Sequence, residues 1–257
     1  MKDGGLSGSL IVLSALTVLA GTAGSEPPSG EGWVPLFNGN DLTGWKVPSG
    51  NDGIWKVVDG VIDCTPRSDL KGDNSLWSKK ALGDFTLHIE WRLKETKGEY
   101  PMPNVLPDGS NETDENGNIV TTTRPNADSG IYLRGSSKSQ INIWCWPVGS
   151  GEVWGYRNDA NMPPEVRAGA TPNVCADKPV GEWNTFVITM KGERLTVVLN
   201  GKTVIDNVPL PGVPESGTIA LQHHGGYNAE RATWSPASSL IQFRNIYYKD
   251  LAPQEGS

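Results

Sequence analysis

The chain has 257 residues, of which 37% are hydrophobic and 20% charged, and its formal net charge at pH 7 is -7. This composition is that of a globular protein and argues against a disordered or membrane-embedded chain. The acidic balance and the lack of any Lys/Arg run argue against nucleic-acid binding, which needs a basic face. The length permits one large β domain or two small ones, and the 31 glycines and 19 prolines favour a turn-rich β fold over a helical one.

The N-terminal segment has the pattern of a signal peptide. Lys2 precedes an apolar run at residues 10–20, and small residues follow this run up to Ser25. The run is too short to span a bilayer comfortably and ends in a region suited to cleavage. We therefore expect export to the periplasm or the extracellular space, with no membrane attachment after cleavage. The expected organisation is a signal peptide at 1–24, a linker at 25–32, one domain at 33–252 and a tail at 253–257.

The remaining chain shows short strands separated by turn signals. Asp59-Gly60 lies between the apolar segments 54–58 and 61–63 and predicts a hairpin with a type I′ turn, and Asn200-Gly201 predicts a second one between 195–199 and 202–205. Further strands are expected at 85–93, 130–134, 140–145, 185–191, 218–223 and 240–249. No segment shows a helical period. Many strands with turns between them favour a two-sheet sandwich or jelly roll.

Two longer segments interrupt this rhythm. Residues 97–127 are rich in Asp, Asn, Gly, Pro and Thr, which favours a solvated long hairpin loop or lid over a calcium loop, because the full calcium-loop motif is missing. Residues 155–179 also have the composition of a long loop. Loops of this length in a compact domain are usually functional or disordered.

The three cysteines, Cys64, Cys145 and Cys175, cannot form a complete disulfide framework. Export would permit one bridge, for which Cys145 and Cys175 are the natural pair because both flank the same loop region. Three buried thiols are the alternative. The three histidines show no metal-binding spacing with the cysteines, so a zinc site is not expected.

Several strands present an unusual polar face. In the strand at 85–93, alternation places His88, Glu90 and Arg92 on the side opposite the apolar residues. A solvated face with a cross-strand salt bridge is the simpler interpretation of this strand alone. The same alternation groups polar or aromatic residues on other strands: Tyr132 with Arg134, Gln140 with Trp144, and Gln222 with His224. Planar polar groups and an indole suit a carbohydrate cleft.

A series of short motifs resembles the 3-keto-disaccharide hydrolase family. These motifs are Leu36-Phe37-Asn38-Gly39 with Leu42-Thr43-Gly44-Trp45, Glu90-Trp91-Arg92, Asn126-Ala127-Asp128-Ser129-Gly130-Ile131-Tyr132-Leu133-Arg134, Gly181-Glu182-Trp183-Asn184, Leu199-Asn200-Gly201, Gly217-Thr218-Ile219-Ala220-Leu221-Gln222-His223-His224-Gly225 and Phe243-Arg244-Asn245-Ile246. They follow in order from about residue 33 to 252. The resemblance implies an all-β, concanavalin A-like jelly-roll β-sandwich of two antiparallel sheets with a concave sugar-binding face.

Two features depart from the family pattern. The family carries a Glu-x-Gln pattern in the strand after Tyr-Leu-Arg, whereas this chain has Ser139-Gln140-Ile141-Asn142, so Gln140 keeps the place of the Gln while the acid is missing. Residues 97–127 form an insertion relative to the family. Because of both departures, the resemblance does not fix the exact substrate.

The resemblance implies a glycoside-cleaving hydrolase that acts on 3-keto-glycosides or 3-keto-disaccharides. A ketone at C3 acidifies the C2 hydrogen, so a base can remove it, expel the C1 group and leave an enone that adds water. Such chemistry needs a base with a pKa near neutrality and a cation at the enolate oxygen. We predict Glu90 or His224 as base or acid and Arg134, or Arg92, at the oxyanion. Substrate contacts are expected from Arg92, Tyr132, Gln140, Trp144 and Gln222.

No cofactor is predicted, and no metal-ligand set is visible, although a divalent metal could take the place of the arginine. The expected partner is an oligosaccharide or 3-keto sugar, not a nucleic acid. A non-catalytic, lectin-like carbohydrate-binding module is the alternative, because it needs the same polar face but no acid–base pair. A structural or adhesive sandwich comes third, because its outer face would carry Lys, Thr and Glu instead.

Overall fold

A computed structural model describes residues 1, 28–228, 233–235, 237 and 239–251. The expected signal-peptide run at 10–20 and the expected tail at 253–257 lie outside the described residues. No helix in the described part of the chain is long and apolar enough to cross a membrane.

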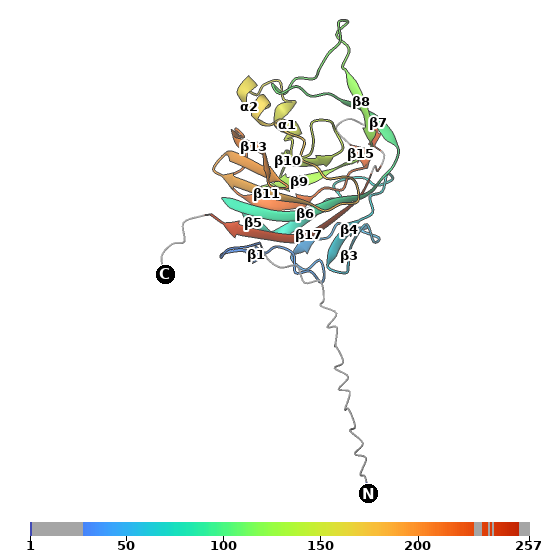
Figure 1. The fold of residues 1–257 in the computed structure, drawn as a ribbon, viewed down its shortest axis with the longest axis vertical. Helices are drawn as coiled ribbons and strands as arrows, with labels where there is room; N and C mark the ends of the chain where they lie inside the picture. Colours follow the sequence, from blue (N-terminus) through green and yellow to red (C-terminus); the bar gives the residue numbers. More distant parts are fainter. Residues whose placement is uncertain (2–27, 229–232, 236, 238, 252–257) are drawn as a thin grey trace.

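Two antiparallel sheets form the body of the protein (Figure 1). The larger sheet, sheet A, has the order β13-β12-β11-β6-β17-β4-β3, with β1 paired to β17. Its strands are β1 (Val34–Pro35), β3 (Trp55–Val58), β4 (Val61–Cys64), β6 (Phe85–Thr96), β11 (Asn184–Lys191), β12 (Arg194–Leu199), β13 (Lys202–Pro209) and β17 (Ser239–Asp250). Sheet B has the order β10-β9-β14-β5-β2. Its strands are β2 (Trp45–Lys46), β5 (Leu76–Leu82), β9 (Asp128–Leu133), β10 (Ser136–Trp144) and β14 (Gly217–Leu221). The fold is the expected all-β jelly-roll sandwich.

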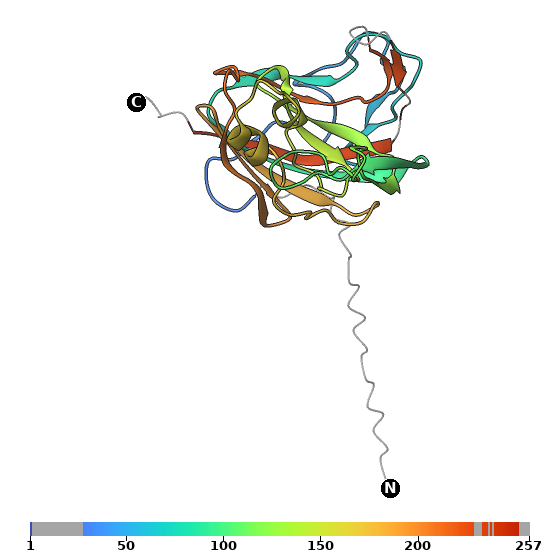
Figure 2. The same ribbon diagram turned by 90° about the horizontal axis from the view of Figure 1, so that it is seen from above.

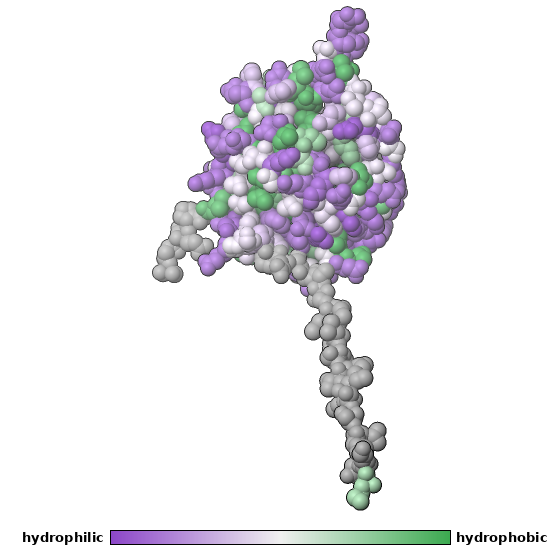
Figure 3. Space-filling view, viewed as in Figure 1, coloured by the Kyte–Doolittle hydropathy of each residue, from purple (hydrophilic) through white to green (hydrophobic). Residues whose placement is uncertain are grey.

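The core lies between the sheets and follows the alternation of the strands. In β6, Leu87 and Ile89 are fully buried, while His88 and Glu90, which follow them, are only half-buried. Hydrophilic residues prevail on the face of the molecule that Figure 3 shows. From sheet B, Ile131, Ile141 and Ile219 enter the same hydrophobic cluster. Burial of each such side chain stabilises the fold by about 1.5–3 kcal/mol, so the alternation fixes which face of each strand points inward.

The two hairpin turns are confirmed. Asp59 and Gly60 have φ angles of 51° and 78°, and Asn200 and Gly201 have φ angles of 51° and 81°. Type I′ turns need a positive φ at both central residues, which Asn, Asp and Gly adopt most easily. The turns connect β3 to β4 and β12 to β13.

The segment 97–127 contains a hairpin, as expected. It contains β7 (Glu99–Pro103) and β8 (Thr121–Pro125), which pair with each other in a sheet of their own. The green β7–β8 region rises beyond the body of the sandwich in Figure 1. A second small hairpin is formed by β15 (Gly226–Asn228) and β16 (Thr233–Ser235).

The segment 155–179 is not entirely loop, contrary to expectation. It contains most of α1 (Trp154–Arg157) and all of α2 (Pro164–Gly169). Helices this short show no detectable period, and Pro164 at the start of α2 has the fixed φ that suits a first helical position. The two helices lie next to each other over the body of the molecule (Figure 2), where α1 contacts β10 and α2 contacts β13.

All three cysteines are free thiols. Cys64 is buried, Cys145 is half-buried and Cys175 is exposed, so neither the Cys145–Cys175 bridge nor three buried thiols is found. The Cys175 thiol lies 3.6 Å from the Asp177 carboxylate as a hydrogen-bond donor.

Candidate functional site

A cleft of about 400 Å³ opens on the outer face of sheet B. Strands β5, β9 and the end of β14 form its floor, because their core-facing residues alternate with side chains that point away from the core. Its lining residues are Gly72, Asp73, Asn74, Ser75, Trp77, Tyr132, Gly135, Ser137, Gln222, His223, His224, Gly225, Gly226, Tyr227 and Ser235. The cleft therefore contains three of the predicted site residues, Tyr132, Gln222 and His224.

His224 forms an acid–base pair with Asp128 at the edge of this cleft. His224 follows β14 and Asp128 begins β9, and His224 Nε2 lies 3.3 Å from Asp128 Oδ2. Burial raises the pKa of Asp128, while the neighbouring imidazole acts in the opposite direction. The side chains of both residues are partly exposed, so the pair is accessible from the cleft. His224 Nδ1 itself is buried and has no hydrogen-bond partner among the described residues.

Asp128 was not predicted as a site residue, although a signal for it exists. It stands two residues before Gly130 and four before Tyr132, so the alternation that placed Tyr132 on the outer face places Asp128 there as well. The cross-strand position of His224 cannot be read from this pattern, because it depends on how β9 and β14 pair.

Tyr132 and Trp77 form the aromatic part of the cleft. Their ring centroids lie 5.6 Å apart with an interplanar angle of 41°. Trp77, which was not predicted, donates from Nε1 to Asp73 Oδ2 at 2.5 Å, so its ring orientation is fixed. Burial, and secondarily the charge of Asp73, raises the pKa of Tyr132 well above its usual range. The phenol therefore stays a hydrogen-bond donor at neutral pH.

Two glutamines are joined beside these rings. Gln140 Nε2 donates to Gln222 Oε1 at 2.7 Å and lies 3.2 Å from the Ser129 carbonyl. Gln140 is thus close to the cleft and orients Gln222, but it does not line the cleft. The amide group of Gln222 is held in one orientation, which suits recognition of a sugar hydroxyl.

Glu90 and Arg92 lie on the opposite side of the molecule, so the expectation that they share a cleft with His224 is wrong. Glu90 Oε2 pairs with Arg244 Nε at 2.7 Å, and Arg92 Nε donates to Gln242 Oε1 at 2.6 Å. β6 belongs to sheet A and β9 to sheet B, and both turn their apolar faces to the shared core. Their polar faces consequently point in opposite directions. The polar face of β6 therefore carries a cross-strand salt bridge, as the simpler interpretation of this strand predicted.

Arg134 is also placed away from the cleft. Its side chain is 1% exposed and donates to the carbonyls of Gly83, Gly192 and Pro214 and to the carboxylate of Asp84. A φ of 50° at Arg134 takes the chain out of β9 after Leu133. The alternation that grouped Arg134 with Tyr132 does not extend through such a turn. The guanidinium of Arg134 therefore does not line this cleft.

Trp144 is almost fully buried and does not line the cleft. Its Nε1 donates to the Gly149 carbonyl at 2.7 Å, and its ring stacks on Trp146 at 4.2 Å and 9°. In the pairing of β9 with β10, Trp144 stands directly opposite Asp128. Trp144 thus adjoins the His224–Asp128 pair from the neighbouring strand without facing the cleft.

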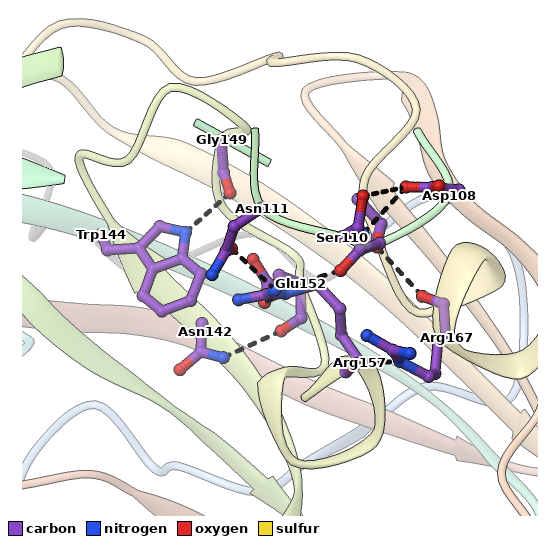
Figure 4. Close-up of polar contacts among 11 residues, drawn as sticks. Asp108, Ser110, Asn111, Asn142, Trp144, Gly149, Glu152, Arg157 and Arg167 are labelled. Atoms are coloured by element: carbon purple, nitrogen blue, oxygen red, sulfur yellow. Dashed lines mark hydrogen bonds and ion pairs between the residues drawn. The ribbon is translucent and has the colours of Figure 1, made fainter. Parts of the chain in front are cut away.

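A buried polar cluster holds the surrounding segments in place (Figure 4). Glu152 and Arg157 form an ion pair with almost no exposed surface. Arg157 Nη1 also donates to the carbonyl of Gly109 and to Asn111 Oδ1, and Asn142 Nδ2 donates to the carbonyl of Glu152. Burial raises the pKa of Glu152 to about 7, although Arg157 acts to lower it. The cluster joins the 97–127 segment and the α1 region to β10.

The described part of the cleft contains neither a Lys or Arg side chain nor a set of metal ligands. Its described lining contains the carboxylate of Asp73 but neither Lys nor Arg, and Lys71 nearby lies over the ring of Tyr227. Over the described ranges, no group of three or more His, Cys, Asp or Glu residues is placed to hold a metal ion.

The protein is a jelly-roll β-sandwich, and its family match supports a carbohydrate-active role. Residues 32–249 match the family described as the 3-keto-alpha-glucoside-1,2-lyase-like domain. The match covers most of the sequence, and the chain belongs to this family.

Solved structures are similar at low identity. A protein from Parabacteroides distasonis ATCC 8503, provisionally classed as a glycosyl hydrolase, is 18% identical with a TM-score of 0.49, over 86% of this chain and 94% of that one. A second such protein from the same organism is 23% identical with a TM-score of 0.47, over 85% and 99%. The carbohydrate-binding module CBM66 from Bacillus subtilis is 15% identical with a TM-score of 0.42, over 83% and 99%. No curated protein matches the chain.

Proposed function

We propose that this protein cleaves 3-keto-glycosides in the cleft on the outer face of sheet B. The observation that carries the proposal is the His224–Asp128 pair, which stands at a cleft lined by Trp77, Tyr132 and Gln222. The cleft supplies a base, a phenol that remains protonated, an oriented amide and an indole face. These are the groups that binding and deprotonation of a keto sugar require.

In the proposed reaction, His224 takes the proton from C2 of the sugar, which the neighbouring ketone has made acidic. The C2–H electron pair forms the C1–C2 double bond of the enone as the C1–O bond breaks, and the leaving group takes up a proton. Water then adds to the enone, and the net result is hydrolysis. Asp128 orients the imidazole and stabilises the charge that it acquires.

The remaining residues have binding roles in this proposal. Tyr132 donates a hydrogen bond to the enolate oxygen in place of the expected arginine, because no Lys or Arg is found in the described lining. Gln222 binds a hydroxyl, and Gln140 fixes its orientation. Trp77 stacks on the sugar ring. No pair of carboxylates across a glycosidic bond is needed, in contrast to ordinary glycosidases.

The description of the family as lyase-like bears on the last step. A lyase would release the enone, whereas a hydrolase would add water before release. The elimination step and the residues proposed for it are the same in both cases. Product analysis under single-turnover conditions separates the two outcomes.

The test compares the purified protein on 3-keto-trehalose and on trehalose. We expect glucose release from the keto sugar alone, and deuterium at C2 of the released 3-keto-glucose when turnover takes place in D2O. Equal cleavage of both sugars, or release of 3-keto-glucose without deuterium at C2, would rule out the elimination route. Binding of unoxidised glucans without turnover of any keto sugar would favour the lectin-like alternative.

We also propose that the protein is exported. The apolar run at residues 10–20 supports this proposal. N-terminal sequencing of the protein from fractionated cells tests it, with the mature chain expected to begin near residue 25. An intact N-terminus in the cytoplasmic fraction would contradict it.

A further inference from the structure

A second cavity lies at the end of the sandwich, close to the His224–Asp128 pair. It has a volume of about 320 Å³. Its lining is mainly apolar and comprises Trp91, Leu93, Pro125, Trp144, Cys145, Trp146, Cys175, Pro179 and Val180, together with Arg124, Asp177, Lys178 and Asn184. The volume is at the lower end of the range for small-molecule sites, so it suits a single ring rather than an extended chain.

Three of the four polar residues of this cavity already have partners within the protein. Asp177 Oδ2 accepts from the Ser150 amide at 2.9 Å, and Lys178 Nζ donates to the Trp183 carbonyl at 2.9 Å. Asn184 accepts through Oδ1 from Lys178 N and Asn200 Nδ2 and donates through Nδ2 to the Glu182 carbonyl. Only the exposed Arg124 makes no side-chain hydrogen bond or ion pair with the described residues. The cavity therefore offers few polar groups for sugar hydroxyls and much apolar and aromatic surface.

The cavity adjoins the proposed catalytic pair through two connections. Trp144 in its wall stands directly opposite Asp128 in the β9–β10 pairing, where side chains on one face lie about 4.5–5.5 Å apart. Pro125, also in its wall, is three residues before Asp128, a span of at most about 11 Å. A glycoside whose reacting carbons lie at His224 can therefore extend its second half toward this cavity.

We propose that the cavity binds the leaving-group half of the substrate and that this half is an apolar, planar ring, as in an aryl glycoside. Trp146 stacks on Trp144 and, being only half-buried, presents its outer surface to such a ring. This inference rests on the proposed function, because it assigns the leaving group of the same substrate. It also gives a role to the 97–127 segment, since Arg124 and Pro125 at the end of β8 form part of the wall.

The test measures kcat/KM for a phenyl 3-keto-glucoside and for 3-keto-trehalose with the full-length mature protein. The wild type should prefer the phenyl substrate by about tenfold or more, which corresponds to about 1.4 kcal/mol. Trp146→Ala should remove this preference by lowering kcat/KM for the phenyl substrate alone. Val180→Asp, at an exposed position on the cavity wall, should do the same without removing a packed ring. Trp183→Ala is the matched control, because Trp183 lies between Arg92 and Arg244 on sheet A.

The outcomes separate this inference from the proposed function. If the wild type turns over both substrates without preferring the phenyl one, or if Trp146→Ala and Val180→Asp lower both rates equally, the aryl site is overturned while the function stands. If no keto sugar is turned over, the proposed function is wrong. Binding of phenyl glucoside, measured by tryptophan fluorescence, then tests whether the cavity binds an aromatic ring. The aryl site would then be supported if Trp146→Ala and Val180→Asp abolish binding while Trp183→Ala does not. Binding that they leave unchanged would overturn it.

Discussion

His224 Nε2 lies 3.3 Å from Asp128 Oδ2, and this contact joins the third residue after β14 to the first residue of β9. The pair stands at the cleft of sheet B and not beside Glu90, which faces the opposite side of the sandwich. This placement changes which substitutions are expected to affect activity.

Replacement of His224 tests the proposed base directly. His224→Ala should lower kcat on 3-keto-trehalose by about 10²- to 10⁴-fold, the usual contribution of a positioned general base. Asp128→Asn should cause a smaller loss, because it weakens the orientation of the imidazole but leaves the base in place. His88→Ala is the control, since His88 lies on sheet A and contacts the Asn245 carbonyl. A His224→Ala variant with full activity would rule out this role.

Glu90→Gln should retain activity, in contrast to what the sequence alone suggested. The Glu90–Arg244 pair is partly exposed on the outer face of sheet A, and such pairs contribute at most about 1 kcal/mol to the free energy of unfolding. Steady-state kinetics and urea unfolding measure both quantities. Loss of turnover in a folded Glu90→Gln protein would return Glu90 to the active site and contradict the assignment of the cleft.

Arg134→Met should reduce stability and leave catalysis unchanged in the folded fraction. The guanidinium satisfies three buried or partly buried carbonyls and the carboxylate of Asp84, so its removal should lower the free energy of unfolding by about 3 kcal/mol. Arg194→Met provides the control, because Arg194 is exposed and donates to a single carbonyl; its cost should stay within about 0.5 kcal/mol. A stable Arg134→Met protein with a large loss of kcat would instead support the oxyanion role.

The buried Glu152 predicts a pH dependence of stability. Its pKa in the folded protein is about 7, above the ordinary value of 4.5. The folded state therefore binds the proton more tightly than the unfolded state, and the stability linked to this group is fully present below about pH 4.5. It is lost as the pH rises toward and through about 7.

Glu152→Gln isolates this contribution. The Gln side chain resembles the protonated carboxyl and cannot lose a proton, so the stability of the variant should not fall with this group as the pH rises from about 5 to about 8. The wild type should lose stability over this range, and the difference between the two proteins should therefore change with pH. Thermal unfolding across this range measures the difference, and Glu115→Gln in the exposed hairpin is the control. A difference that stays constant with pH would contradict the raised pKa of Glu152.

The acidic character of the cleft predicts a preference for neutral sugars. Asp73 lines the cleft, and Asp128 lies beside it, so an anionic ring would meet like charge. The KM for a 3-keto-glucuronoside should exceed that for the matching glucoside by about tenfold or more. Asp73→Asn should narrow this ratio. Equal KM values for the two substrates in the wild type would contradict the prediction.

Much of the fold could be predicted from local patterns. The Asp59-Gly60 and Asn200-Gly201 turns need only two residues with a positive φ, so their sequences were sufficient. The short helices α1 and α2 escaped detection because fewer than two turns show no period.

The candidate site was only half predictable, for a physical reason. Alternation along a strand tells which residues share a side of that strand, and this correctly placed Tyr132 on an outer face. It does not tell to which sheet a strand belongs. Glu90 and Tyr132 both point outward, but β6 and β9 lie in sheets whose outer faces are opposite, and only the tertiary structure decided this. The same holds for Arg134, whose positive φ ends the alternation, and for His224 and Asp128, which only strand pairing brings together.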